Sequence, residues 1–507
     1  MHRTLVLNVV GLTPALLGEN TPHLLRFRQR GGLRALRTIT PAVTCSVQST
    51  MLTGRLPEAH GIVGNGWYFR ELSQVWLWRQ SNQLVAGDKV WDEARQRDPA
   101  FRSAKLFFWY NMYSTADVSI TPRPMYTADG RKIPDVYTEP PELRDQLTAQ
   151  LGTFPLFHFW GPRADIRSSR WIARATERVL DGSKPTLTLT YLPHLDYDLQ
   201  RFGPDSSRVA PALREIDALC GELFEVADKR GVRVVVLSEY GITPVRGVVH
   251  VNRALRQAGL LRVREELGRE QLDPGGSSAF AVADHQIAHV YVKDPARIGE
   301  VASLCEKLPG VERVLDDAGK RSIGLAHPRS GELVLISQAD HWFSYYFWLD
   351  DERAPDYART VDIHAKPGYD PVELFLDPKL PFPTLTVARK LLLRKLGFRT
   401  LLDVIPLDAG LVRGSHGRPT DDSREGPLFM SSTPDLLPDG DVEAQAVRRL
   451  LKRHIFDKYL GSHTRSGLRD PHVGGASESR PIQPRRFDCR CSSTCVRCRE
   501  YAAASAG

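Results

Sequence analysis

Continuous apolar runs and amphipathic segments follow one another along this chain, and these two patterns predict its elements. Apolar runs rich in β-branched and aromatic residues are typical of buried strands, and they occur at residues 4–12, 104–112, 185–193 and 232–241. Amphipathic segments between them predict helices at residues 22–30, 46–53, 165–182 and 210–231. Strands separated by helices of this length predict an α/β fold with a mostly parallel central sheet and helices on both faces.

The pattern changes near residue 251. Shorter apolar runs at residues 278–292, 331–338 and 342–349 mix with one predicted helix at residues 297–308. We therefore interpret residues 251–377 as a smaller α+β cap or insertion subdomain. Residues 1–250 would form the first part of the core, and residues 378–460 would return to it and end in a helix around residues 442–459. Residues 461–507 would be a disordered basic tail.

The composition narrows the functional class. Of the 507 residues, 42% are hydrophobic and 25% are charged, as in soluble globular proteins. A net charge of +8 would suit a nucleic-acid-binding protein, but residues 461–507 hold eight Arg and four Asp or Glu, which supplies half of that excess. The nearly balanced remainder argues against a nucleic-acid groove. No apolar run approaches the length of a membrane span.

The cysteines fall into two groups. Cys45, Cys220 and Cys305 are scattered, as is usual in a reducing compartment, so we expect a cytoplasmic protein. The other four form the pattern C-x-C-x3-C-x2-C at residues 489–498. A zinc site is conceivable there, but the surrounding Arg, Ser, Gly and Pro residues favour disorder.

Polar side chains follow several of the predicted strands. In an open α/β sheet, ligands gather at the carboxyl ends of the strands. Four polar segments are expected at that edge: residues 11–14, 44–46, 193–200 and 238–241. Their convergence predicts a functional site.

The segment "TPAVTCSVQSTMLTG", residues 40–54, places Thr44 where an extended stretch becomes a helix. A hydroxyl at that junction lies beside free backbone N–H groups, which favour anions and above all phosphate. The alternative is that Thr44 only caps the helix.

Residues 40–65, "TPAVTCSVQSTMLTGRLPEAHGIVGN", resemble the nucleophile region of the nucleotide pyrophosphatase/phosphodiesterase family, in the alkaline phosphatase superfamily. Thr44 falls on the nucleophilic threonine of that family. The resemblance continues, in the family's order, through "YLPHLDYDLQRFGP", "VVVLSEYGI" and "RGSHG", and it covers roughly residues 1–420. It implies an alkaline phosphatase-like fold.

The resemblance also implies a two-zinc site, in which the metals activate the threonine for in-line attack on a phosphodiester. Asp196 and His416 match metal ligands, and Glu239 stands where the family has Asp. Val10, Val47, Gln200 and Tyr240 occupy the positions of the family's remaining metal ligands and of its oxyanion-binding Asn. These side chains are poor ligands for zinc or for an oxyanion. An ordinary di-zinc centre is therefore not expected.

A single divalent ion, Zn, Mn or Mg, held by Asp196, Glu239 and His416 is compatible with what remains. Two segments offer candidate substitute metal ligands: "DHQIAH", with Asp284, His285 and His289, and "TVDIHAKPGYDP". In the latter, Asp362 and His364 would share one face of an extended segment, which suits joint ligation. The alternative is that these are hydrogen-bonded loop and strand residues.

Two functional hypotheses follow. In the first, the protein is a phosphoric ester hydrolase whose Thr44 attacks a metal-bound phosphate ester or diester of a phosphorylated small molecule. In the second, it is a catalytically impaired pseudoenzyme of the same fold that binds a phosphorylated ligand or partner. An enzyme would bring the candidate ligands to one point, whereas a pseudoenzyme would hold them in hydrogen bonds.

Overall fold

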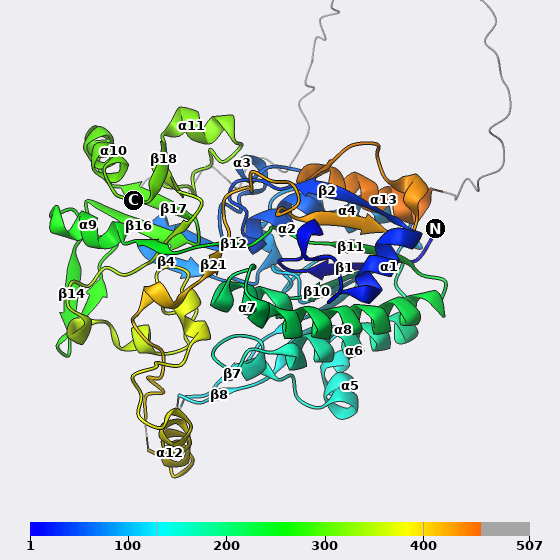
Figure 1. The fold of residues 1–507 in the computed structure, drawn as a ribbon, viewed down its shortest axis with the longest axis horizontal. Helices are drawn as coiled ribbons and strands as arrows, with labels where there is room; N and C mark the ends of the chain where they lie inside the picture. Colours follow the sequence, from blue (N-terminus) through cyan, green and yellow to red (C-terminus); the bar gives the residue numbers. More distant parts are fainter. Residues whose placement is uncertain (129, 399, 458–507) are drawn as a thin grey trace, which may run out of the picture. The chain divides into compact units, whose positions relative to one another are not determined.

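A mixed sheet lies at the centre of the described part of the computed structural model, residues 1–128, 130–398 and 400–457 (Figure 1). Nine of the described strands form it, in the order β23-β2-β22-β11-β1-β10-β5-β6-β9. The strands from β11 to β6 run parallel, whereas β22 and β9 pair antiparallel with their neighbours. Their bounds are β1 Thr4–Val9, β2 Gly32–Arg37, β5 Ser103–Leu106, β6 Val118–Pro122, β9 Val136–Glu139, β10 Leu187–Leu192, β11 Arg233–Leu237, β22 Leu428–Ser431 and β23 Val442–Glu443.

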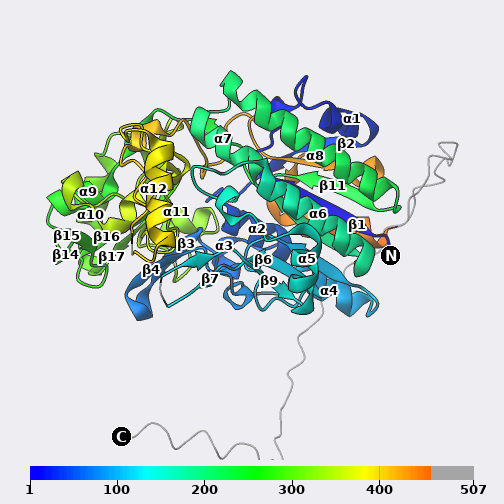
Figure 2. The ribbon, with the colours of Figure 1, turned by 90° about the horizontal axis from the view of Figure 1, so that it is seen from below.

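Helices cover both faces of this sheet (Figures 1 and 2). Helices α6 and α8 lie along one face, with α1 packed on α8, and α2, α4 and α13 lie on the other. The predicted α/β architecture is confirmed. The bounds are α1 Pro22–Arg30, α2 Thr44–Thr53, α4 Val90–Arg97, α6 Ile166–Gly182, α8 Ala210–Asp228 and α13 Val447–Phe456. None of the described helices has the length and apolar character that a membrane crossing requires.

Four of the described strands form a second, antiparallel sheet in the order β16-β17-β19-β18. It lies within the residues predicted as a cap and packs on a hydrophobic core of its own. The hairpin turn between β16 and β17 contains His285 and Gln286, and His285 contacts His416 beside the carboxyl edge of the central sheet. The bounds are β16 Ala279–Asp284, β17 Ile287–Val292, β18 Val311–Leu315 and β19 Leu333–Ser337.

Several predicted elements are shorter than expected. The strand predicted at residues 104–112 ends at Leu106, because Phe107 and Tyr110 have φ angles of 62° and 55°, which an extended strand cannot contain. The run at residues 342–349 contributes only β20, His341–Phe343. The last helix begins at Val447 instead of residue 442. The predicted tail, with its four cysteines, lies outside the described residues.

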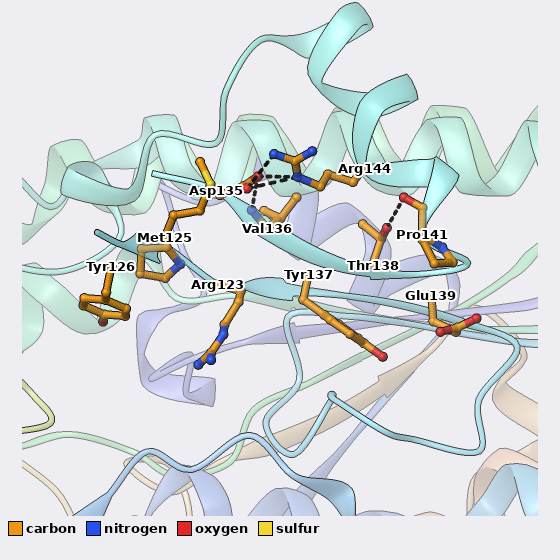
Figure 3. A pocket seen from close by; sticks show the side chains of 11 residues that line it. Arg123, Met125, Tyr126, Asp135, Val136, Tyr137, Thr138, Glu139, Pro141 and Arg144 are labelled. Carbon is orange, nitrogen blue, oxygen red and sulfur yellow. Dashed lines mark hydrogen bonds and ion pairs between the residues drawn. The ribbon is translucent and has the colours of Figure 1, made fainter. Parts of the chain in front are cut away.

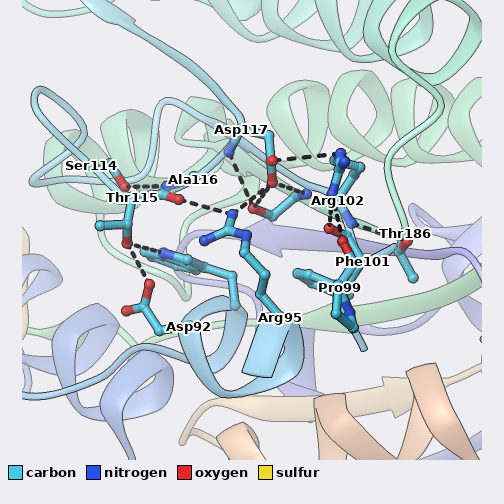
Figure 4. Close-up of polar contacts among 12 residues, drawn as sticks. Asp92, Arg95, Pro99, Phe101, Arg102, Ser114, Thr115, Ala116, Asp117 and Thr186 are labelled. Atoms are coloured by element: carbon cyan, nitrogen blue, oxygen red, sulfur yellow. Dashed lines mark hydrogen bonds and ion pairs between the residues drawn. The ribbon is translucent and has the colours of Figure 1, made fainter. Parts of the chain in front are cut away.

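Asp117 ties α4 to the neighbouring strands (Figure 4). One carboxylate oxygen accepts hydrogen bonds from the Ser103 amide at 2.8 Å and from Arg95 at 2.9 Å. Beside it, Trp91 donates to the Thr115 hydroxyl at 2.8 Å. These bonds fix the helix against the loop that leads into β6.

A buried ion cluster holds the segment that follows the second sheet. Lys366 lies 2.7 Å from both Asp370 and Glu373, and all three side chains are at most 2% exposed. Glu373 also accepts hydrogen bonds from the Trp160 indole and from the Asp362 amide. Because one ammonium faces two buried carboxylates, loss of Lys366 would leave both carboxylates buried without a cation.

Replacing Lys366 by Met is expected to lower the free energy of unfolding by about 3–5 kcal/mol, because two buried carboxylates lose their cation. Urea denaturation measures this loss. The matched control is Lys229→Met, which breaks a surface pair with both side chains more than 70% exposed and should cost less than about 0.5 kcal/mol. Equal effects of the two substitutions would contradict the role assigned to the buried cluster.

Candidate functional site

Thr44 is the first residue of α2, and Val43 is the N-cap, so the alternative in which Thr44 caps the helix is wrong. The Thr44 side chain is buried. Its hydroxyl lies 3.1 Å from the hydroxyl of Tyr240, which follows β11. The predicted nucleophile position is therefore hydrogen-bonded to the residue that replaces a family histidine.

Asp196 lies on the other side of Tyr240. The Tyr240 hydroxyl donates a long bond of 3.4 Å to Asp196, and the Gln200 amide donates to the other carboxylate oxygen at 2.7 Å. Asp196 and Gln200 are one turn apart on α7, His194–Phe202, so both side chains lie on the same helix face. Burial raises the pKa of Asp196 to about 7.

Glu239 is completely buried beside this pair. Asn8 and Gln48 both donate to its Oε1 at 2.5 Å, while its Oε2 has no hydrogen-bond partner in the described part of the chain. Burial raises the pKa of Glu239 to about 8, although the amide donors and the nearby Thr44 hydroxyl oppose the rise. In the absence of a cation, this carboxyl carries a proton at neutral pH.

Four aromatic rings lie in a row beside Thr44, with two stacked contacts and one tilted contact between them. The His416 ring lies 3.5 Å from Tyr240 and 3.7 Å from His285, and His285 lies 3.6 Å from Tyr369 (centroid distances). His416 Nδ1 donates to the Ala42 carbonyl at 2.8 Å, and burial lowers the pKa of both histidines, which are therefore neutral. The stack joins the turn of the second sheet to the carboxyl edge of the first.

Asp284, a candidate substitute ligand, connects the second sheet to α2 through Asn65. It accepts bonds from the Asn65 amide at 2.7 Å and the Asn65 side chain at 2.9 Å, and it contacts His285 Nδ1 at 2.8 Å. Asn65 in turn accepts from the Cys45 amide in the first turn of α2. His289 bonds to the Val63 carbonyl.

Asp362 and His364 lie elsewhere. Asp362 accepts bonds from the His364 and Ala365 amides at 3.3 Å, and the exposed His364 lines a cavity of about 330 Å³ with Trp76 and Tyr357. Asp362 and His364 contact these neighbours and not the residues around Thr44. The geometry matches the hydrogen-bonded loop that was the alternative for this pair.

A larger cavity, of about 550 Å³, lies at the edge of the central sheet (Figure 3). Arg123, Tyr126 and Tyr137 line it, and Arg144 closes one side through a 2.7 Å ion pair with Asp135. None of the predicted site residues lines this cavity. It is therefore separate from the site at Thr44.

The side chains around Thr44 do not fit a two-metal centre. Asp196 and Glu239 accept bonds from amide side chains, and Tyr240 lies between Thr44 and Asp196, while Val10 offers no ligand atom. Among residues 1–128, 130–398 and 400–457, no three His, Cys, Asp or Glu side chains converge as a metal site would require.

Residues 4–370 match the type I phosphodiesterase/nucleotide pyrophosphatase family. The chain belongs to this family. A curated relative, an uncharacterized pyrophosphatase/phosphodiesterase of Schizosaccharomyces pombe, is 25% identical over 235 residues. That match covers 44% of this chain and 41% of the relative, so the chain spans less than half the length of the relative it matches.

Solved structures share the fold at low identity. Phosphonoacetate hydrolase from Sinorhizobium meliloti is 15% identical with a TM-score of 0.57, and the match covers 89% of this chain and 96% of that one. Murine ectonucleotide pyrophosphatase/phosphodiesterase 5 is 14% identical with a TM-score of 0.53, covering 91% and 97%. The family is one of phosphodiesterases and pyrophosphatases, and the architecture is alkaline phosphatase-like.

Sequence reasoning missed three polar residues of the site. Asn8 stands out as a polar residue inside an apolar strand, and Gln48 as an amide in a buried helix, so both left a weak signal. Tyr369, whose hydroxyl donates to Gln200 at 3.0 Å, left none, because its loop reaches the site only through tertiary packing.

The loop after β5 supports the site through Lys105. The buried ammonium donates to the carbonyls of Trp109 and Tyr110 at 2.8 and 2.9 Å, and the Trp109 amide donates to Gln48. Burial lowers the pKa of Lys105 from 10.5 to about 7.

The stability contributed by Lys105 is expected to depend on pH. Between pH 7 and 10.5 the unfolded chain binds the proton that the folded chain has released, so stability rises with pH. Relative to Lys105→Met, the wild type should gain about 1 kcal/mol of unfolding free energy per pH unit above pH 7. Urea denaturation of both proteins at two pH values in this window measures the gain. A difference that does not change with pH would contradict the lowered pKa.

Proposed function

We propose that this chain binds a phosphorylated small molecule at the start of α2 and does not hydrolyse it by the two-metal route of its family. One observation carries the proposal: the Tyr240 hydroxyl connects Thr44, at 3.1 Å, to Asp196, at 3.4 Å. The Thr44 oxygen is thus hydrogen-bonded to a phenol hydroxyl, at the position where the resemblance places a metal-binding histidine.

The charge state of the site favours a phosphoryl group. With their pKa values raised to about 7 and 8, Asp196 is partly protonated and Glu239 mostly protonated near neutral pH, so the two carboxyls repel an anion less than two ionised carboxylates would. Ser46 Oγ and His285 Nε2 are buried, and neither has a hydrogen-bond partner among the described residues. A polar ligand that bonds to such atoms gains the free energy that their burial costs.

The competing function is hydrolysis of a phosphate ester with Thr44 as nucleophile. The contacts of the Tyr240 hydroxyl with Thr44 and Asp196 favour hydrolysis, because they offer a path for the Thr44 proton. When Asp196 is ionised, the Thr44 proton can pass to the Tyr240 oxygen while the Tyr240 proton passes to Asp196. The Thr44 oxygen would then bond to phosphorus while the ester oxygen leaves as the alcohol, taking up the proton held by Asp196, and a water molecule would afterwards release the phosphate from Thr44.

Calorimetric titration with AMP, a ligand of the murine relative in its inactive form, and with inorganic phosphate tests binding. Thr44→Ala should weaken binding about tenfold, because a hydrogen bond to a charged group is lost. Ser322→Ala, a surface hydroxyl that bonds the Gly319 carbonyl, is the control and should bind as wild type. Turnover of bis-p-nitrophenyl phosphate that disappears in Thr44→Ala would overturn the binding-only proposal.

Restoring the family's ligands should restore metal binding. In Val10→Asp/Gln200→His/Tyr240→His, two imidazoles and a carboxylate return, so stoichiometric divalent metal is expected where the wild type holds less. Metal content after gel filtration, with circular dichroism to check folding, measures this. Tyr240→Phe is the control: it removes the hydroxyl and supplies no ligand. Stoichiometric metal in the wild type, with turnover abolished by a chelator, would contradict the proposal.

A further inference from the structure

Helix α12, Pro383–Lys395, follows the residues matched to the family and lies at the end of two extended connections (Figure 1). Figure 1 shows it projecting away from the second sheet. On one side Val387 packs against the hydrophobic core of the region around that sheet. The most exposed leucines of this segment lie on the opposite side.

An apolar row is exposed along α12. Leu385, Leu392 and Leu396 are 67%, 57% and 64% exposed, and their spacing of seven and four residues places them on one helix face. Phe382 and Phe398, at the two ends of the helix, are 79% and 62% exposed. Of the large apolar side chains that are exposed among the described residues, half lie between Leu376 and Leu401. Such concentration on one element marks an interaction surface.

The same segment is strongly basic. Between Asp377 and Asp403 there is no acidic residue. Six Lys and Arg residues lie in that interval: Lys379, Arg389, Lys390, Arg394, Lys395 and Arg399. Lys390 contacts Asp403 at the base of the helix, whereas Arg389 and Lys395 are exposed beside the leucine row. The surface therefore offers apolar and cationic groups together.

We propose that the α12 surface, defined by Phe382, Leu385, Leu392, Leu396 and Phe398 with Arg389 and Lys395, docks on an anionic lipid surface. A helix with leucines on one face and basic residues beside them lies in the plane of a bilayer, its apolar side chains among the acyl chains and its cations at the headgroups. Thirteen residues span only about 20 Å, less than the roughly 30 Å of a bilayer core, so the helix lies on the membrane.

A second copy of the chain fits this surface poorly. Two copies joined through α12 would bring two strongly basic segments together, and like charges across an interface are unfavourable. An anionic lipid surface complements both the charge and the leucines. The proposal is independent of whether Thr44 is catalytic.

Co-sedimentation of the full chain with phosphatidylcholine vesicles, with and without phosphatidylserine, tests the proposal. We expect binding that requires phosphatidylserine and weakens with salt. Leu385→Gln/Leu392→Gln/Leu396→Gln should weaken it by more than about tenfold, because each exposed leucine contributes buried apolar area. Arg389→Gln/Lys395→Gln should weaken it and reduce its salt dependence.

Matched controls separate this surface from the rest of the chain. Leu267→Gln/Leu349→Gln changes exposed leucines elsewhere, at 106% and 51% exposure, and should bind vesicles as wild type does. Absence of vesicle binding by the wild type, or equal loss in this control, would overturn the proposal. A dimer in solution that dissociates in the α12 leucine variant would also overturn the proposal. The same holds if an acidic protein displaces the chain from the vesicles at a lower concentration than lipid headgroup analogues do.

Discussion

The contact of the Tyr240 ring with His416, at 3.5 Å, is the interaction on which the candidate site depends. It places a phenol hydroxyl between Thr44 and Asp196, and it continues through His285 into the second sheet. The hairpin turn that carries His285 also carries Asp284, which reaches the first turn of α2 through Asn65. The position of Thr44 and the position of the second sheet are therefore set by one connected group of contacts.

The departures from the family pattern are consistent with one another. Where a metal would compensate Asp196 and Glu239, the amides of Gln200, Asn8 and Gln48 donate hydrogen bonds to them. Amides stabilise a carboxylate less than a divalent cation does, so burial prevails and the pKa of each carboxyl rises. A single change toward the family, such as Tyr240→His alone, would restore one ligand into surroundings organised for neutral groups.

The sequence predicted the sheet and the helices well where their periodicity is strong. The apolar run at residues 4–12 is typical of a buried strand, and residues 165–182 follow the helical period closely. Residue type also marks helix ends, since Gly54 ends α2 with a φ of 68°. The strand predicted at residues 104–112 was too long because positive φ angles at Phe107 and Tyr110 are imposed by packing, not by residue type. Thr44 was predicted as the nucleophile from the sequence motif at residues 40–65.

What surrounds Thr44 could be predicted only in part. Motif comparison located Val10, Gln200 and Tyr240 and showed that ligand atoms were missing, but it could not show what fills the space. That depends on residues distant in sequence, since His285 and Tyr369 arrive from the hairpin turn and from a loop held by Lys366. Loss of ligands alone would leave room for a weaker metal site. In the structure the Tyr240 hydroxyl and the rings of His416 and His285 take that place, and Tyr240 joins Thr44 to Asp196 by hydrogen bonds.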